Sequence, residues 1–370
     1  MSNRHIEPII FIIHKFTFGG AEKVAKNILE FWISEGRKVE LITIEESDNN
    51  FYKIPKYINH KNIGINKPSK NIFSKIYKNI VVIYRLRSQI KSINATRVLS
   101  FLTRTNVQTI LACINLGKKV IISERNDTAQ QRHMKLVSIL RRCLYRFADL
   151  VTANSKNSIN DMKRYVPYSK LVFIPNMVRI PNKIAKPDKS KIIINVGRLV
   201  SQKSQDILIE AFVELFNRHK EWYIKLLGEG DKRDYLISLT KKNKLNDNVI
   251  FCGLIHDLKP YYISAGIFVL PSIYEGTPNA LLEAMAYGLP CIISDSLPGA
   301  LEIVNNGVNG LVFQSGNKID LANKLQTLMN NPGLRKKLGL QARNSVKHFK
   351  PKIINNEWNR ILFTVNHNDG

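Results

Sequence analysis

Two carboxylates, Glu275 and Glu283, flank a stretch whose residue types are those of a helix start. Thr277 is a good N-cap and Pro278 suits the first helical position. Backbone amides in a first helical turn have no intrahelical acceptor, so they can hold phosphate or sugar oxygens. Gly276 beside this pair, with a carboxylate on each side, favours a ligand site over a plain capping loop with a surface glutamate. The amides concerned belong to Asn279, Ala280 and Leu281.

A pair of cations, Arg198 and Lys203, follows an expected strand over 192–196. Arginine offers forked donors and lysine a point charge, and together they can neutralise a diphosphate. Taken alone, such a pair on a basic surface is usually only solvated. Together with the helix start after residue 277, the ligand-binding interpretation is favoured.

Two loops in the first half of the chain are also candidates. Gly19 and Gly20 precede a helical pattern, where adjacent glycines let the backbone approach a phosphate closely, although a tight turn explains them equally well. Glu124 follows an expected strand, and either a packed charge cluster or a ligand-facing carboxylate fits it. The spacings of dinucleotide dehydrogenases and P-loop ATPases are missing from the sequence, and no metal site stands out.

Short β-branched runs alternate with helical patterns in both halves of the chain, which is typical of parallel α/β sheets. Such sheets would position the loops that carry the candidate residues. We expect an α/β protein of two doubly wound domains. The domains are expected over 1–178 and 191–350, with a linker over 179–190 and a C-terminal helix over 351–370 that packs back on the first domain. The strands are expected over 9–13, 39–44, 97–102, 120–123, 150–153 and 171–174, then over 192–196, 223–227, 249–251, 267–270, 291–293 and 310–313.

Composition is consistent with this architecture. The 370 residues include 44% hydrophobic and 9% aromatic side chains, which excludes disorder as the main state. Four widely separated cysteines suggest buried thiols in a reducing compartment. Because no apolar run is long enough for a signal-peptide core or a membrane span, we expect a cytoplasmic protein.

Charge points to an anionic partner, since the net charge is +27 and residues 51–100 contain eleven Lys or Arg and no Asp or Glu. The stretch 66–93 has the pattern of a basic amphipathic helix. A core-facing helix with a solvated face explains the pattern equally well, but the lack of acidic residues favours docking on the anionic inner face of the cell membrane. Its apolar positions are Ile72, Phe73, Ile76, Ile80, Ile83 and Ile90. Its docking cations are Lys70, Lys75, Lys78, Arg85, Arg87 and Lys91.

With these residues in place, the chain resembles the retaining, nucleotide-sugar-dependent glycosyltransferases of family four. That family has the GT-B fold, in which two Rossmann-like domains enclose a deep cleft. The resemblance covers nearly the whole length. Its motifs are Gly19-Gly20-Ala21-Glu22, Ser155, Pro175-Asn176, Gly197-Arg198-Leu199 with Lys203, Gly228-Glu229-Gly230, Glu275 with Glu283, Glu302-Ile303-Val304 and Asn309-Gly310.

The resemblance implies roles for these residues. Arg198 and Lys203 would hold the donor diphosphate, and Glu283 the ribose hydroxyls. Glu275 would contact the donor sugar. The donor-binding set is then Gly19, Gly20, Arg198, Lys203, Glu275, Gly276, Thr277, Pro278, Asn279, Ala280, Leu281 and Glu283, and the catalytic set is Glu275, Arg198, Lys203 and Glu124. Many family members have a histidine where this chain has Glu124. No cofactor or metal is implied, since the sequence has no Asp-x-Asp.

The implied reaction moves a hexose or N-acetylhexosamine from a UDP-activated sugar to a lipid-linked or growing surface glycan, as in capsule, O-antigen or lipopolysaccharide-core biosynthesis. Two alternatives compete with it. A nucleotide-sugar 2-epimerase on the same fold would show catalytic carboxylates and histidines in both lobes, and the Glu275–Glu283 spacing disfavours it. A nonenzymatic nucleic-acid-binding protein would show a recognisable module with aromatic side chains among basic ones, and none appears.

Overall fold

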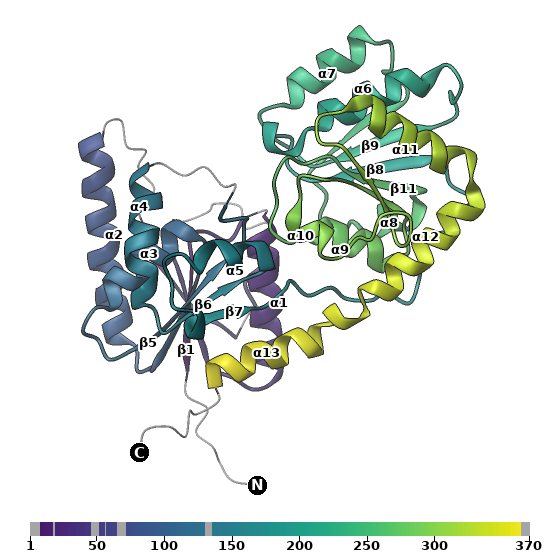
Figure 1. Ribbon diagram of the computed structural model, residues 1–370. Coiled ribbons are helices and arrows are strands. Elements are labelled where there is room, and N and C mark those ends of the chain that lie inside the picture. The colour runs from purple at the N-terminus through teal and green to yellow at the C-terminus, as the bar shows by residue number, and fades with distance from the viewer. Residues whose placement is uncertain are drawn as a thin grey trace. The chain divides into compact units, whose positions relative to one another are not determined.

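The computed structural model describes residues 8–17, 19–45, 52–55, 57–64, 72–129 and 135–363. The chain forms two compact units, each containing a parallel sheet with helices on its faces (Figure 1). Unit 1 consists of Met1–Asn176 and Lys352–Gly370, and unit 2 of Met177–Pro351. The chain therefore passes between the units at 176–177 and again at 351–352.

The described residues of unit 1 form a seven-stranded sheet in the order β3-β2-β1-β4-β5-β6-β7. Its strands are β1 (Ile9–Ile13), β2 (Val39–Thr43), β3 (Asn59–Asn62), β4 (Arg97–Phe101), β5 (Lys119–Glu124), β6 (Leu150–Ala153) and β7 (Leu171–Phe173). Its helices are α1 (Gly20–Ser34), α2 (Ile72–Ser92), α3 (Thr103–Cys113), α4 (Lys135–Leu144), α5 (Lys156–Met162) and α13 (Pro351–Phe363).

Strand β1 shows why both faces of this sheet are covered. All five of its residues are buried, as expected of a central parallel strand. Ile10 and Ile12 belong to the core that α2 and α3 complete. Phe11 points to the opposite face, where its ring lies 6.2 Å from that of Trp32 in α1. Trp358 of α13 is fully buried on that face as well, and its ring centroid lies 5.9 Å from that of Phe101.

Unit 2 contains a six-stranded sheet of described residues in the order β10-β9-β8-β11-β12-β13. Its strands are β8 (Ile192–Val196), β9 (Tyr223–Leu227), β10 (Val249–Gly253), β11 (Ile267–Leu270), β12 (Cys291–Ser294) and β13 (Leu311–Phe313). Its helices are α6 (Gln205–Phe216), α7 (Arg233–Lys242), α8 (Lys259–Ser264), α9 (Asn279–Ala286), α10 (Pro298–Leu301), α11 (Lys318–Asn330) and α12 (Pro332–Ser345). Both sheets reverse strand order beside their first strand, so both units are doubly wound, as predicted.

The segment expected to be a linker lies along unit 2. The Val178 amide donates to the Phe349 carbonyl at 2.8 Å, and the Ala185 amide donates to the Tyr287 carbonyl at 2.9 Å. The buried Arg335 guanidinium donates to the Pro187 carbonyl at 2.7 Å. These contacts make residues 177–190 part of the second unit.

Two expectations from the sequence are wrong. Strand β3 was not expected, because its side chains are polar, and it pairs with β2 as an edge strand. The cysteines are not uniformly buried: Cys113 and Cys291 are buried, whereas Cys143 is exposed and Cys252 is half-buried.

No helix in the described part of the chain is both long and apolar enough to span a membrane.

Candidate active site

Two loops of unit 2 that carry the predicted donor-binding residues are tied together. They follow β8 and β11, which are neighbouring parallel strands, so both loops begin at the same edge of the sheet. The Ile273 amide donates to the Gln202 carbonyl at 2.9 Å. The Gln202 side-chain amide donates to the Tyr274 carbonyl at 2.6 Å. The two sequence clusters around Lys203 and Glu275 therefore form one structural unit.

Lys203 and Glu275 form an ion pair at this junction. Only 15% of the lysine side chain and 13% of the glutamate side chain are exposed. The Ser272 hydroxyl donates to the same Glu275 oxygen at 2.9 Å. A side chain on Gly197 would lie 3.4 Å from Lys203 Cε, so the lysine passes closely over that glycine. The pair fixes both side chains and offsets much of the lysine's charge.

Arg198 contrasts with this pair, because its side chain is exposed and makes no hydrogen bond or ion pair with any described residue. Its backbone is nevertheless fixed. The buried Gln205 side chain donates to the Arg198 carbonyl at 3.0 Å and to the Asn195 side-chain oxygen at 3.2 Å. Asn195 in turn donates to the Val269 carbonyl at 2.9 Å, across to β11. Because the Arg198 backbone is fixed and no described carboxylate offsets the charge of its guanidinium, this residue is suited to bind an anion.

The loop after β9 closes on the same backbone. A Cβ at Gly228 would lie 2.0 Å from the Gly197 carbonyl oxygen, and one at Gly230 would lie 2.2 Å from the Leu199 carbonyl oxygen. The Leu199 amide donates to the Glu229 carbonyl at 2.9 Å. Gly228 has φ +146°, which a residue with a side chain rarely adopts. The two glycines thus allow the β9 loop to support the segment that presents Arg198.

Helix α9 follows Glu275, but it begins one residue later than predicted. Its N-cap is Pro278, with an extended ψ of 116°, and Leu282 donates the first intrahelical hydrogen bond to the Pro278 carbonyl at 3.2 Å. Thr277 is buried and is not the cap, because the extended Pro278 separates it from the helix. The end of the helix is as predicted, with Gly288 at φ +79° just after the last turn.

Glu283 lies on the second turn of α9 and is half-buried. The Tyr262 hydroxyl donates to it at 3.2 Å, and the Tyr262 ring stacks on Tyr287 with centroids 5.1 Å apart. Burial, and then the Glu283 carboxylate, raise the pKa of the Tyr262 hydroxyl. The tyrosine therefore stays protonated and holds the carboxylate by donating to it.

In unit 1, Gly19 and Gly20 lie at the start of α1, as predicted. Gly19 is the N-cap, and Lys23 donates to its carbonyl at 3.1 Å. A Cβ at Gly19 would lie 2.1 Å from a carboxylate oxygen of Glu22. Contact of either glycine with a donor stays a prediction.

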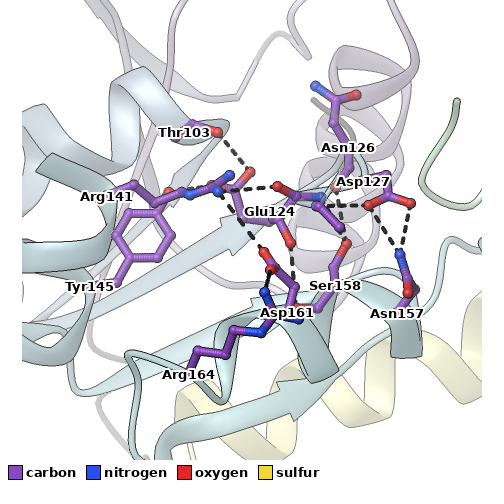
Figure 2. Close-up of polar contacts among 12 residues, drawn as sticks. Thr103, Glu124, Asn126, Asp127, Arg141, Tyr145, Asn157, Ser158, Asp161 and Arg164 are labelled. Atoms are coloured by element: carbon purple, nitrogen blue, oxygen red, sulfur yellow. Dashed lines mark hydrogen bonds and ion pairs between the residues drawn. The ribbon is translucent and has the colours of Figure 1, made fainter. Parts of the chain in front are cut away.

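Glu124 is fully buried at the end of β5 (Figure 2). The Thr103 hydroxyl donates to it at 3.0 Å, and the Tyr145 hydroxyl donates to its other oxygen. Burial raises the pKa of Glu124, while the hydrogen bond from Tyr145 and the charge of Arg141 act in the opposite direction. These contacts favour the packed cluster over a ligand-facing carboxylate, and they argue against Glu124 as a catalytic residue.

Of the four predicted docking cations whose side chains the structure describes, three are engaged with the protein. Lys78 pairs with Glu45 at 3.2 Å, and Arg85 donates to the Ile63 carbonyl at 3.0 Å. Arg87 donates to the Ala112 carbonyl at 3.1 Å and to a second carbonyl beyond it. Lys91 is exposed, whereas Lys70 and the Lys75 side chain lie outside the described residues.

The apolar positions of α2 do not form one buried face. Val82, Leu86 and Ile90 enter the core, while Ile76 and Ile80 are exposed. Two tyrosines, Tyr77 and Tyr84, are exposed beside them. The apolar surface of the helix therefore continues past the part that the unit covers.

Sequence reasoning missed the residues that position the site. Ser272, Gln205 and Tyr262 each hold a predicted site residue in place. Ser272 and Gln205 lie within a few positions of motif residues, so proximity was a usable signal. Tyr262 is distant in sequence from Glu283, and nothing in the sequence marked it. Within the described ranges, no three His, Cys, Asp or Glu side chains group so that they could hold a metal ion.

Comparison with known protein families identifies the family of this chain. The model of "Glycosyltransferase Family 4" matches residues 18–180, and that of "Glycosyl transferases group 1" matches residues 177–345. Together they cover both units. The chain belongs to glycosyltransferase family four. It is an enzyme, which excludes the nonenzymatic nucleic-acid-binding alternative.

Relatives of this glycosyltransferase align over almost its full length. An uncharacterized glycosyltransferase of Haemophilus influenzae is 27% identical over 362 residues, which cover 95% of this chain and 98% of the relative. An alpha-1,4-N-acetyl-D-galactosaminyltransferase of Campylobacter jejuni, whose name gives a PP-undecaprenol-linked glycan as acceptor, is 27% identical over 361 residues, with 96% and 98% covered.

Solved structures identify the fold as GT-B, as predicted. HepE of Anabaena, in complex with UDP and glucose, superposes with a TM-score of 0.82 at 18% identity and covers 97% of this chain and 100% of its own. TarM of S. aureus superposes with a TM-score of 0.81 at 13% identity, with 97% and 100% covered. At these identities the likeness shows the fold alone.

We predict that Gly230→Ala destabilises the glycosyltransferase by about 1–3 kcal/mol, because the new methyl group meets the Leu199 backbone. Gly333→Ala is the matched control, since nothing lies within 4 Å of a Cβ there and the position is helical. The control should change stability by about 0.5 kcal/mol or less. Urea unfolding of both variants measures the difference, and equal midpoints would show that the β9 loop is not closely packed.

Proposed function

We propose that this glycosyltransferase moves a hexose or N-acetylhexosamine from a UDP-sugar to a lipid-linked glycan, with retention at the anomeric carbon and without a metal. The observation that carries the proposal is the uncompensated Arg198 beside the Lys203–Glu275 pair, on one sheet edge of unit 2. The C. jejuni relative is named for a PP-undecaprenol-linked acceptor, and HepE was solved with UDP. Both support the assigned substrate classes.

The chemistry follows from charge. Cleavage of a sugar–diphosphate bond leaves negative charge on the departing phosphate, and fixed donors aimed at that charge lower the barrier. Arg198 and Lys203 supply cations, and the amides at the start of α9 supply dipoles of the same sign. In a front-face substitution the leaving phosphate accepts the acceptor's proton, so no separate base is required. The sequence also lacks the Asp-x-Asp of metal-dependent enzymes.

Slow hydrolysis of the donor tests the reaction without an acceptor. We expect one member of a panel of UDP-hexoses and UDP-N-acetylhexosamines to be hydrolysed. If the sugar is α-linked in the donor, NMR spectra should show the α-anomer of the free sugar as the first product. The rate should be unchanged in EDTA. Release of the β-sugar, or activity lost in EDTA and restored by manganese, would contradict retention or metal independence respectively.

Arg198→Ala should weaken UDP binding about 10- to 100-fold, because it removes a charge-assisted contact to the diphosphate. Arg218→Ala is the control, since Arg218 is an exposed arginine just after α6 whose side chain makes no hydrogen bond or ion pair with a described residue. Calorimetric titration with UDP gives both affinities. Unchanged UDP affinity in Arg198→Ala would remove this residue from the site.

We further propose that the enzyme docks peripherally on the anionic inner face of the cell membrane, where a lipid-linked acceptor lies. Its contact is the exposed apolar flank of α2, formed by Ile76, Tyr77, Ile80 and Tyr84. Amphipathic surfaces of this kind combine apolar insertion with attraction between basic residues and anionic lipids. The high positive charge of residues 51–100 supplies the attraction.

The double variant Ile80→Ser/Tyr84→Ser should bind anionic vesicles about 10- to 100-fold more weakly, because these side chains are 60% and 74% exposed and would enter the bilayer. Ile353→Ser, at an exposed isoleucine of α13, is the control and should bind as the wild type does. Sedimentation with vesicles of graded anionic content measures both. Equal binding of the two variants would show that α2 is not the docking surface.

A further inference from the structure

A cationic cavity lies between α4 and α5 of unit 1. Its volume is about 340 Å³, which is in the range of small-molecule sites. Three arginines line it, and the other lining side chains are small or polar except for one carboxylate. The lining residues are Thr128, Ala129, Ser138, Arg141, Arg142, Asn157, Asn160, Asp161 and Arg164.

Arg141 is the informative member, because it is buried and incompletely paired. Its residue is 4% exposed, yet its Nε and Nη1 have no hydrogen-bond acceptor. Its Nη2 donates to the Thr128 carbonyl at 3.1 Å and lies 3.9 Å from an oxygen of Asp161 (Figure 2). Unpaired donors on a buried guanidinium are costly unless a ligand or water completes them.

Two further arginines lie at the mouth of this cavity. Arg142 is exposed, and the Arg164 side chain is 78% exposed with Nη1 3.9 Å from Asp161. Figure 2 shows Asp161 between Arg141 and Arg164. The Asp161 carboxylate thus lies 3.9 Å from two guanidinium groups, beyond hydrogen-bond distance, and with Arg142 the lining side chains keep a net positive charge.

Two further acidic groups, Asp127 and Glu124, lie near the cavity but are not among its lining residues. Asp127 accepts hydrogen bonds from the Asn157 side chain, at 3.0 and 3.2 Å, and from the Ala129 amide at 2.9 Å. Glu124 is enclosed behind Arg141 by Thr103 and Tyr145. Burial raises the pKa of Glu124, which favours its neutral form, and Asp161 is the one carboxylate among the lining residues.

We propose that this cavity binds a phosphate or diphosphate group, and that the group belongs to the lipid-linked acceptor. The ligand class follows from the donor set: guanidinium groups recognise phosphate oxygens by paired, charge-assisted hydrogen bonds, and the volume admits more than one phosphate. The assignment to the acceptor rests on the proposed function. Unit 2 holds the cations assigned to the donor diphosphate, Arg198 and Lys203, so this cavity gives unit 1 a cationic anion site of its own.

The first test uses inorganic pyrophosphate and the full-length protein saturated with UDP, which occupies the proposed donor site. Calorimetry should show binding that falls about 10- to 100-fold in Arg142→Gln and in Arg164→Gln, which lie at the exposed mouth and should not disturb folding. Lys163→Gln is the matched control, because Lys163 neighbours Arg164 but does not line the cavity. UDP affinity should be the same in all three variants. If Lys163→Gln weakens pyrophosphate binding equally, the general positive charge of this surface binds the anion, and the proposal of a specific cavity is wrong.

A competition experiment identifies the source of the anion. A short-chain prenyl diphosphate should displace pyrophosphate at lower concentration than inorganic phosphate does. Equal or better displacement by inorganic phosphate would overturn the assignment to the acceptor. If the protein hydrolyses UDP-sugars but binds no pyrophosphate, this inference is wrong and the proposed function stands. If it binds pyrophosphate at this cavity but hydrolyses no nucleotide sugar, the proposed function is wrong and the anion site stands.

Discussion

The site of unit 2 depends on a backbone contact too close to admit side chains. Where the loop after β9 meets the loop after β8, a single methyl group at Gly228 or Gly230 would overlap a carbonyl oxygen. This contact fixes the segment on which Arg198 is exposed. Gln202 then links this segment to the loop that holds Glu275, because it donates to the Tyr274 carbonyl and accepts from the Ile273 amide. The cation that we propose binds the donor diphosphate is thus positioned by neighbouring main chain, whose position does not depend on the rotamer of the arginine.

Charge is distributed unevenly in this enzyme. The chain has nearly twice as many basic as acidic residues, 56 against 29, and several acids lie directly against a cation. Glu275 compensates Lys203, and Glu45 compensates Lys78. The cations left without such a partner then define where anions can bind. Arg198 in unit 2 is one such place. In unit 1, three arginines line a cavity that contains the single carboxylate of Asp161, so part of their charge is also left over.

The sequence predicted most strands, because buried parallel strands are apolar runs bounded by turn residues. It did not predict β3, whose Asn59 contributes a polar edge that has no periodic signal. Site residues at strand ends were placed in the right loops, since strand order determines which loops meet. Details set by packing were not predictable: Pro278 takes the cap position from Thr277, Ile80 is left uncovered, and Glu124 is enclosed.

Unit 1 is built from the two ends of the chain, and this has a consequence for biosynthesis. Trp358 packs on Phe101, yet the whole of Met177–Pro351 is synthesised between them. Unit 2 is synthesised before α13, so one face of the earlier sheet is the last surface to be covered. Contacts between residues so distant in sequence form late, and the aromatic surface around Phe101 stays open to water until then. The second unit to be synthesised is therefore the first that can finish folding.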